Sequence, residues 1–539
     1  MSTVGALLGR GRDQDVAIAV PDGPSLTYGQ VCEMVHDASL RLASFGVRPD
    51  DRVAMVFPNG PEAIVLYLAT ASVATACPLN AAYKEAEFRF YLEDTGARFL
   101  LAPAGGGADA RRALPNGATV IEADIDDAGR FSLESRGPVN GAPTPSPNAS
   151  NVRIAGSARL AWAGGSALPT RGREKDITIP ARGRETNRTP DPDTVALVLH
   201  TSGTTSRPKR VPLRHRNLAA SVANIVEHYR LGPEDVSLCV MPLFHVHGLV
   251  ASALATLASG GTLAVPRRFT PMMFWPIARQ VRPTWFTASP TPHELILMRI
   301  EEKRPAGTER LRFVRSCSSA LSPELMSRME ARFGVPVVEA YGMTEASHQM
   351  SSNPLPPERR IPGSVGRGTG VEIAVLDKAG ALLPSGSAGE VGIRGPNVID
   401  GYENNPEANL ASFTNGWFRT GDLGTLDGDG YLRLLGRIKE LINRGGEKIA
   451  PREIDEALES HPAVKEAVSF GVPHATWGEE VAAAVVLSEP VPEKELIAHC
   501  RGRLAEFKVP KRVHIVESIP RTPTGKVQRR FVAEQLNPR

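Results

Sequence analysis

Residues 51–80 read DRVAMVFPNGPEAIVLYLATASVATACPLN, and this stretch decides the class of fold. Residues 51–58 form an apolar run of the length of a buried strand. Pro61 then begins a long apolar segment, 61–80, that is typical of a buried helix, since proline fits the first helical turn. A strand followed directly by a buried helix is the repeating unit of a mainly parallel sheet.

The same alternation continues along much of the chain. Helical spacing at 38–47 precedes the opening stretch, and strand and helix patterns resume from 194 to about 345. From 361 onward, short apolar runs separated by turns predict a β-rich subdomain, and a helix–strand–strand–helix–strand unit follows. We therefore predict an α/β fold in which a large N-terminal domain of doubly wound sheets with a β-rich subdomain, 1–436, precedes a small α+β C-terminal lid domain, 437–539. Residues 137–193, rich in Pro, Gly, Ser, Asn and Arg, predict a flexible excursion without a catalytic role.

Composition excludes several classes of function. The formal net charge of +3 provides no large basic surface for nucleic acid. The five cysteines are odd in number and form no CxxC pair, which argues against zinc and redox sites and favours a reducing compartment. No apolar run approaches the roughly 20 residues of a membrane helix, and neither a secretory signal nor a peroxisomal address is evident. We expect a cytoplasmic protein; monomer and homodimer both stay open.

The first motif with chemical meaning is LHTSGTTSRPKRVPL, residues 199–213, which follows an apolar strand. Glycine lets a backbone approach a ligand closely, and hydroxyl and amide groups bind phosphate oxygens. The spacing differs from that of a P-loop, so a polar turn between a strand and a helix is the alternative. The candidate phosphate ligands are Thr201, Ser202, Gly203, Thr204, Thr205 and Lys209.

Two further motifs carry carboxylates. VEAYGMTEASHQM, residues 338–350, places Tyr341, Thr344 and Glu345 at the end of a predicted strand, where open α/β sheets bind ligands. Glu345 could hold Mg²⁺ and Thr344 a phosphate oxygen, although a solvated carboxylate is the simpler interpretation. RTGDLG, residues 419–424, places Asp422 in a turn, where it could bind ribose hydroxyls or stabilise the turn itself.

The last two motifs are basic. GRIKELINRGGEKI, residues 436–449, contains Arg437, Lys439 and the Gly445–Gly446 pair at the predicted domain boundary. PRTPTGKVQRR, residues 520–530, presents Lys526 in a turn marked by proline and glycine. Each of these basic residues, considered alone, is more often an ordinary surface group.

Taken together and in this order, the motifs resemble those of the adenylate-forming (AMP-binding) superfamily of acyl-CoA synthetases, luciferases and peptide-synthetase adenylation domains. The resemblance extends from LTYGQV (26–31) to GKVQRR (525–530) and is weakest over 137–193. It implies an enzyme with two half-reactions. A carboxylate attacks the α-phosphate of ATP to give acyl-AMP and pyrophosphate, and a thiol, usually that of coenzyme A, then displaces AMP.

The resemblance also implies roles for individual residues. The 201–209 loop matches the triphosphate loop, Glu345 the Mg²⁺ ligand, Asp422 the ribose partner and Arg437 a nucleotide ligand. Ser319, Ala320 and Tyr341 match the adenine pocket, Lys439 the hinge, and Gly445 and Gly446 the side that receives coenzyme A. The implied catalytic residues are Lys526, Thr344, Glu345 and His245. The chain departs from the common loop pattern at Ser206 and Arg210, where glycine is usual, and Arg210 leaves the mobility of the loop open.

The acid substrate is narrowed by four segments that closely resemble the oxalate–CoA ligase branch: residues 80–94, 200–209, 315–323 and 347–357. By that resemblance His348 and Ser318 contact the distal carboxylate and His245 gates the site. Such polar groups suit oxalate or another small (di)carboxylate. Medium- or long-chain fatty acids stay open, and a catalytically dead nucleotide-binding protein is a remote alternative. An amino-acid adenylase is disfavoured because Phe244 and His245 stand where an aspartate is usual.

Overall fold

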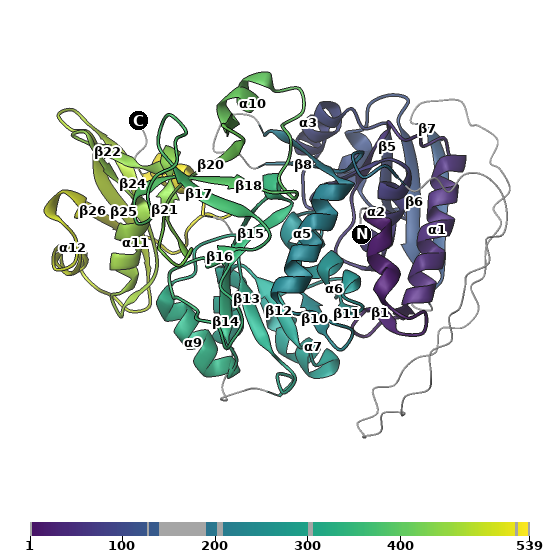
Figure 1. Cartoon of the computed structure of the whole chain (residues 1–539), viewed down its shortest axis with the longest axis horizontal. Helices are drawn as coiled ribbons and strands as arrows, with labels where there is room; N and C mark the ends of the chain where they lie inside the picture. Colours follow the sequence, from purple (N-terminus) through teal and green to yellow (C-terminus); the bar gives the residue numbers. More distant parts are fainter. Residues whose placement is uncertain are drawn as a thin grey trace.

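The computed structural model describes residues 3–126, 129–138, 190–201, 208–299, 306–522 and 527–536. Most of the predicted excursion, 137–193, lies outside these ranges. The described residues form four sheets, two in the body of a large N-terminal domain, one in its β-rich subdomain and one in a small C-terminal domain (Figure 1). The predicted α/β class and its large and small domains are therefore confirmed.

The first large sheet is built around the opening stretch of the sequence. Its inner strands are parallel, and β7 and β9 pair antiparallel at the edges. In order across the sheet, the strands are β7 (Phe131–Pro138), β6 (Thr119–Ile125), β5 (Phe99–Pro103), β3 (Arg52–Met55), β4 (Thr75–Pro78), β8 (Val195–His200) and β9 (Arg210–Arg214).

The second large sheet is also mainly parallel, with β2, β15 and β16 antiparallel to their neighbours. It carries the predicted glutamate motif on β14. In order across the sheet, the strands are β16 (Arg367–Gly368), β15 (His348–Ser352), β14 (Val337–Met343), β13 (Phe313–Ser316), β12 (Trp285–Ala288), β10 (Val236–Cys239), β11 (Thr262–Ala264), β1 (Val16–Ala19) and β2 (Ser25–Thr27).

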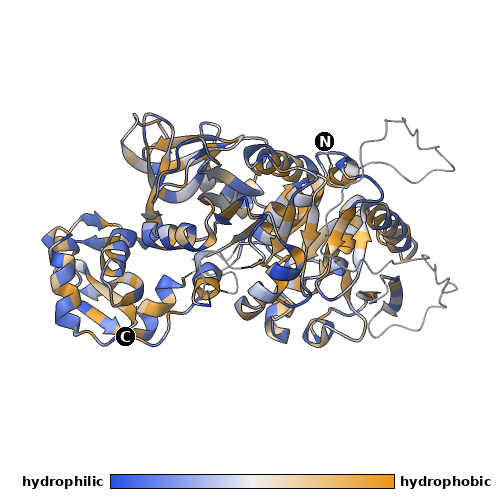
Figure 2. Ribbon diagram, turned by 90° about the horizontal axis from the view of Figure 1, so that it is seen from below, coloured by the Kyte–Doolittle hydropathy of each residue, from blue (hydrophilic) through white to orange (hydrophobic). Residues whose placement is uncertain are grey.

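Helices cover and separate these two sheets. Helix α5 contacts β8 and β9 of the first sheet as well as β15 of the second, and apolar residues gather on the central strands (Figure 2). The helices of the large domain are α1 (Tyr28–Ser44), α2 (Pro61–Val73), α3 (Glu85–Thr95), α4 (Ala108–Arg112), α5 (His215–His228), α6 (Ala255–Ala258), α7 (Phe274–Val281), α8 (Pro290–Leu297) and α9 (Pro323–Phe333), with short turns η1 (Gly5–Arg10) and η3 (Pro271–Met273) and a π-helix, η2 (His247–Leu254).

One sequence prediction about the opening stretch was wrong in extent. Helix α2 begins at Pro61 and is largely buried, as predicted, but it ends at Val73 instead of continuing to residue 80. Ala74 adopts an extended backbone, and Thr75–Pro78 then forms β4 between β3 and β8. A continuous apolar run gives no periodic signal for where a buried helix yields to a buried strand.

The β-rich subdomain and the C-terminal domain follow the predicted order of elements. The subdomain contains β17 (Glu372–Leu376), β18 (Ala388–Arg394), α10 (Pro406–Ser412), β19 (Phe413–Thr414), β20 (Trp417–Leu426) and β21 (Leu432–Arg437). After η5 (Ile438–Glu440) come β22 (Ile442–Arg444), β23 (Glu447–Ile449), α11 (Pro451–Glu459), β24 (Val464–His474), β25 (Gly478–Leu487), α12 (Glu493–Arg501), η6 (Glu506–Lys508), β26 (Arg512–Ile515) and α13 (Arg529–Leu536). Among the helices described, none has the length and apolar character needed to cross a bilayer.

The loop that contains the hydroxyl-rich motif joins β8 to β9, so it connects two strands of a hairpin and not a strand to a helix. His200 pairs with Arg210 across the hairpin, and the Thr201 amide donates to the Lys209 carbonyl at 3.0 Å. Arg210 anchors this base. Its Nη1 donates to the Asp94 carbonyl at 2.6 Å, its Nε lies 3.4 Å from Asp94 Oδ2, and its own carbonyl accepts from the Glu403 amide.

We expect Arg210→Ala to lower the free energy of unfolding by about 2–4 kcal/mol, because it removes a guanidinium that donates to the Asp94 carbonyl and lies 3.4 Å from the largely buried Asp94 carboxylate, which keeps its contact with His200. Arg214→Ala on the same strand removes an exposed pair with Asp400 and is expected to cost less than about 1 kcal/mol. Chemical denaturation of both variants measures the difference. Equal losses would show that Arg210 is not an anchor of the hairpin.

A buried carboxylate, Glu339, lies on β14. Its Oε1 accepts from the Leu321 amide at 3.0 Å, and its Oε2 has no hydrogen-bond partner in the described part of the chain. Burial raises the pKa of Glu339 to about 7, although the positive charge of Arg452 opposes the shift. The folded protein therefore holds a proton on this carboxyl that the unfolded chain releases at lower pH.

This raised pKa makes stability fall as pH rises. Below the unfolded value near 4.5 the contribution of Glu339 is fully present, and it is lost as pH rises through about 7. We expect the free energy of unfolding of Glu339→Gln to match that of the wild type at pH 4.5 and to exceed it at pH 8 by up to about 3 kcal/mol. Thermal unfolding at the two pH values measures this difference. The exposed Glu358→Gln controls for the loss of a carboxylate. A pH-independent difference at Glu339 would contradict the shift.

Candidate active site

The candidate site lies where β13 and β14 end and the β-rich subdomain meets them. Tyr341 and Glu345 come from the end of β14 and from the short turn η4 (Thr344–Ala346) that follows it. Asp422 comes from β20 and Arg437 from the end of β21. The structure thus brings together residues from three motifs that lie far apart in the sequence.

A three-residue cluster forms the first part of the site. Asp422 and Arg437 pair across β20 and β21, and Arg437 Nε lies 2.7 Å from Asp422 Oδ1. The Tyr341 hydroxyl donates to Asp422 Oδ2. Burial, reinforced by the Asp422 charge, raises the pKa of Tyr341 well above its ordinary value, so the phenol keeps the proton that it donates. Asp422 is therefore held in one orientation from two sides.

A second cluster surrounds Glu345, which is buried and not the solvated carboxylate of the simpler interpretation. The Tyr402 hydroxyl donates to Glu345 Oε1 at 2.8 Å, and Lys209 Nζ lies 4.3 Å from the centre of the Tyr402 ring. Burial lowers the pKa of Lys209, an effect that Glu345 opposes and Lys439 increases. The base of the 201–209 loop therefore lies beside the predicted metal ligand.

The donor set at Glu345 fits a magnesium ion that arrives with a nucleotide. Mg²⁺ prefers oxygen ligands and is commonly bound by one or two carboxylates together with phosphate oxygens. Within the described ranges, no three His, Cys, Asp or Glu side chains gather as a metal cluster. Thr344, half-buried at the start of η4, supplies a further oxygen close to Glu345 in the chain.

A third cluster contains the predicted acid-binding residues Ser318 and His348, joined by a residue that the sequence did not reveal. His247 Nδ1 lies 2.9 Å from Ser318 Oγ, and the His247 and His348 rings stack with centres 5.1 Å apart. His245 lies two residues earlier, half-buried, and its Nδ1 accepts from the His247 amide at 3.2 Å. Its predicted gating role stays a prediction.

Beneath these histidines lies Arg315, a fully buried arginine on β13. Its Nη2 lies 3.0 Å from His348 Nε2 and donates to Gln349 Oε1 at 2.9 Å. Its Nη1 donates to Thr287 Oγ1 at 2.9 Å. Within the described ranges no acidic side chain pairs with Arg315, so the predicted acid-binding region contains a buried guanidinium without a carboxylate partner.

The backbone of this third cluster is held in uncommon conformations. Ser318, Ser347 and His348 all have positive φ, at 74°, 51° and 107°. A Cβ at Gly342 would lie 2.1 Å from the His348 carbonyl oxygen, so only glycine allows β14 to pass this close to His348. Positive φ in residues other than glycine gathers at functional sites, where surrounding structure enforces it.

The structure describes some of the other predicted site residues, and the rest lie outside the described ranges. Ser319, half-buried, and Ala320, exposed, follow Ser318 at the end of β13, next to β14. Lys439 is exposed in η5, and Gly445 and Gly446 are exposed between β22 and β23, both with positive φ. Lys526 and four members of the loop, Ser202, Gly203, Thr204 and Thr205, lie outside the described residues.

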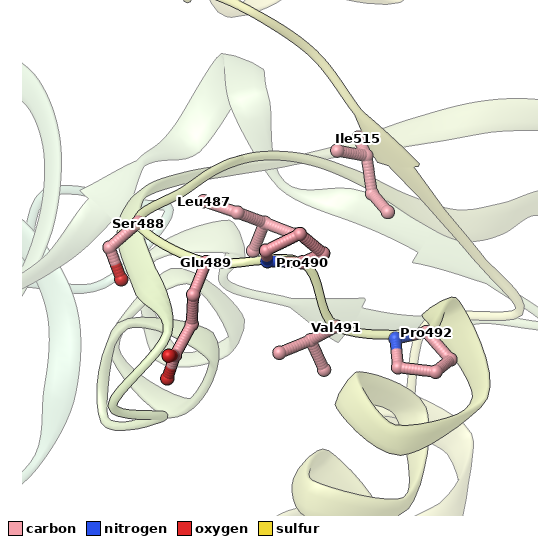
Figure 3. Close-up of a pocket in the computed structure, with 7 residues that line it drawn as sticks. All are labelled: Leu487, Ser488, Glu489, Pro490, Val491, Pro492 and Ile515. Atoms are coloured by element: carbon pink, nitrogen blue, oxygen red, sulfur yellow. The ribbon is translucent and has the colours of Figure 1, made fainter.

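Two residues of the site, His247 and Arg315, had no sequence signal specific enough to select them, and Tyr402 was missed as well. The only available hints were the His-x-His spacing at 245–247 and an arginine inside an apolar strand. A separate hollow of about 600 Å³ lies in the C-terminal domain between residues 487–492 and Ile515 (Figure 3). It contains none of the predicted site residues.

Comparison with known proteins agrees with this geometry. The profile of the AMP-binding enzyme family matches residues 9–403, and that of the AMP-binding enzyme C-terminal domain matches 453–526. The chain is 45% identical to an oxalate–CoA ligase of Arabidopsis thaliana over 96% of this chain and 95% of that protein. It is 41% identical to an oxalate–CoA ligase of Saccharomyces cerevisiae over 96% and 94%, respectively.

Solved structures resemble the whole fold. ATP-bound MatB from Rhodopseudomonas palustris superposes with a TM-score of 0.81 at 30% identity, covering 99% of this chain and 98% of that one. Together with the matches over both domains, this likeness confirms the predicted family. The chain belongs to the AMP-binding enzyme family and, within it, to the AMP-forming acyl-CoA synthetases.

Proposed function

We propose that this enzyme activates oxalate, or another small dicarboxylate, as acyl-AMP and transfers the acyl group to coenzyme A. The observation that carries the proposal is the polarity of the acid-binding region, where Ser318, His247 and His348 lie over the buried guanidinium of Arg315. A fatty-acid chain needs an apolar channel, whereas a second carboxylate needs hydrogen-bond donors and positive charge. The 45% identity to an oxalate–CoA ligase supports the same substrate.

The first half-reaction joins an anion to a polyanion, so neutralising charge and aligning the attack are the main tasks. A carboxylate oxygen forms a bond to the α-phosphorus as the bond to pyrophosphate breaks. We assign Lys209 and the 201–205 hydroxyls to the departing pyrophosphate, and Lys526 to charge developing between carboxylate and α-phosphate. Mg²⁺, held through Glu345, would neutralise phosphate charge when bound.

Asp422 and Arg437 are assigned to the ribose and phosphates of the nucleotide, and Ser319, Ala320 and Tyr341 to its adenine. Since Tyr341 and Arg437 hold Asp422 in place before any ligand arrives, ordering this carboxylate adds little cost to binding. In the second half-reaction the thiol sulfur of coenzyme A attacks the acyl carbon and AMP leaves.

We further propose that the domain boundary lies between 436 and 437 and that the C-terminal domain turns about Lys439 between the two half-reactions. Such a rotation would withdraw Lys526 and bring the Gly445–Gly446 turn toward the thiol. The exposed position of Lys439 in the short η5 segment is compatible with a hinge. A cytoplasmic location remains our prediction from the sequence.

The substrate proposal is tested by measuring pyrophosphate release with oxalate, malonate, acetate, octanoate and palmitate. We expect oxalate to give the highest kcat/KM and acetate, which lacks the second carboxylate, to fall at least about tenfold below it. A preference for octanoate or palmitate would favour a fatty acyl-CoA synthetase. Absence of release with every acid, despite ATP binding, would favour a catalytically dead protein.

The role of Lys526 is tested by separating the half-reactions. We expect Lys526→Ala to reduce acyl-AMP formation by about 10²–10³-fold, the usual cost of losing a group that stabilises the transition state. Thiolation of supplied acyl-AMP should change little. Lys511→Ala, which removes an exposed partner of Glu506, is the matched control. Equal losses in both half-reactions would mean that Lys526 acts in another way.

A further inference from the structure

Arg315 uses every donor that it has. Four contacts are to oxygen or nitrogen atoms of Tyr229, Thr287, His348 and Gln349 at 2.9–3.0 Å, and a fifth places Nη1 3.4 Å from His247 Nε2. Within the described ranges no acidic side chain forms an ion pair with Arg315. A fully buried cation with no acidic side chain beside it in the described ranges is unusual, because buried charges are normally paired.

The geometry limits the protonation of the two stacked histidines. A guanidinium has five N–H donors and no acceptor, so a nitrogen that faces it favourably must offer a lone pair. His348 Nε2 is such a nitrogen, at 3.0 Å. His247 Nε2 lies between Arg315 Nη1 and the Thr287 hydroxyl, which is 2.6 Å away. His348 Nε2 therefore accepts, and His247 Nε2 accepts when the Thr287 hydroxyl donates to it. In neutral rings with this arrangement the single proton is on Nδ1.

Charge repulsion also favours the neutral form of both histidine rings. Two imidazolium rings stacked 5.1 Å apart above a buried guanidinium would bring three positive charges together at low dielectric. With the proton on Nδ1, His247 donates to Ser318 Oγ at 2.9 Å. The Ser318 hydroxyl proton is then directed away from His247. A chain of hydrogen bonds thus runs from Arg315 through His247 to Ser318, whose hydroxyl can donate into the pocket.

We propose that Arg315 is a positioning residue for the acid substrate: it fixes His247 and His348 as neutral Nδ1–H tautomers and thereby orients Ser318 to donate to the distal anionic group. The role rests on the proposed function, since it presumes an acid with a second anionic end. The buried charge of Arg315 additionally favours such an acid over a neutral chain.

A comparison of two amides at position 247 tests the tautomer. In His247→Asn the amide nitrogen takes the place of Nδ1, whereas in His247→Gln it takes the place of Nε2. We expect both variants to raise the KM for oxalate, because both lose the ring that stacks on His348, and the Gln variant to raise it by about tenfold more than the Asn variant, equivalent to 1.4 kcal/mol. The KM for ATP should be unchanged in both. Equal effects, or a better Gln variant, would overturn the proposal.

Combining each of these two substitutions with Arg315→Met tests whether Arg315 is the residue that sets the tautomer of His247. If Arg315 sets the tautomer, the preference for Asn over Gln disappears when the guanidinium is gone; if Arg315 only supports the fold, the preference persists. Thermal unfolding and ATP binding verify that each variant is folded. Should Arg315→Met fail to fold, ¹⁵N NMR of histidine-labelled wild-type enzyme reads the protonated ring nitrogen directly, and protonated Nε2 in His247 or His348 would overturn the assignment.

Failure of this proposal and failure of the proposed function give different results. The NMR measurement needs no substrate, so it reports the tautomers whichever acid the enzyme uses. If oxalate is not a substrate but the Asn variant still surpasses the Gln variant with malonate, Arg315 keeps its role and the oxalate assignment falls. If oxalate is turned over but the two amides behave alike, the oxalate assignment stands and the role of Arg315 falls.

Discussion

The cluster of Tyr341, Asp422 and Arg437 is the interaction on which the arrangement of the site depends. Tyr341 belongs to the second large sheet, Asp422 to the β-rich subdomain, and Arg437 ends the strand that leads toward the C-terminal domain. Two parts of the chain, the second large sheet and the β-rich subdomain, thus share one carboxylate. Tyr341 holds that carboxylate from the sheet and Arg437 holds it from the subdomain. A ligand bound to Asp422 therefore also fixes the subdomain relative to the sheet.

Much of the fold could be predicted from the sequence because its signals are local. Apolar runs of strand length, helical spacing and turn residues identified the parallel sheets, the β-rich subdomain and the order of elements in the C-terminal domain. The extent of α2 could not be predicted, because Val73 and Thr75 lie in one unbroken apolar segment and only pairing with β3 and β8 makes the second part a strand. Pairing between distant strands leaves no local signal.

The residues of the candidate site likewise fall into those that local motifs predict and those that they do not. Glu345, Asp422 and Arg437 stand in short motifs whose spacing can be recognised, and the structure places each among charged or polar partners. Arg315 and His247 could not be selected in this way, because their importance arises from contacts between residues as far apart as 229 and 348. An arginine in an apolar strand has the same local pattern whether it faces solvent or a buried pocket.

The positive φ angles at Ser318, Ser347 and His348 have a consequence for the evolution of the enzyme. Each such residue costs on the order of 1–3 kcal/mol, an amount comparable to a sizeable fraction of a protein's net stability. Selection for heat tolerance alone would therefore favour glycine at these positions, which would remove the Ser318 and His348 side chains from the proposed acid-binding region. Retaining the three side chains places a ceiling on thermal adaptation, which the rest of the chain can raise only by gains elsewhere.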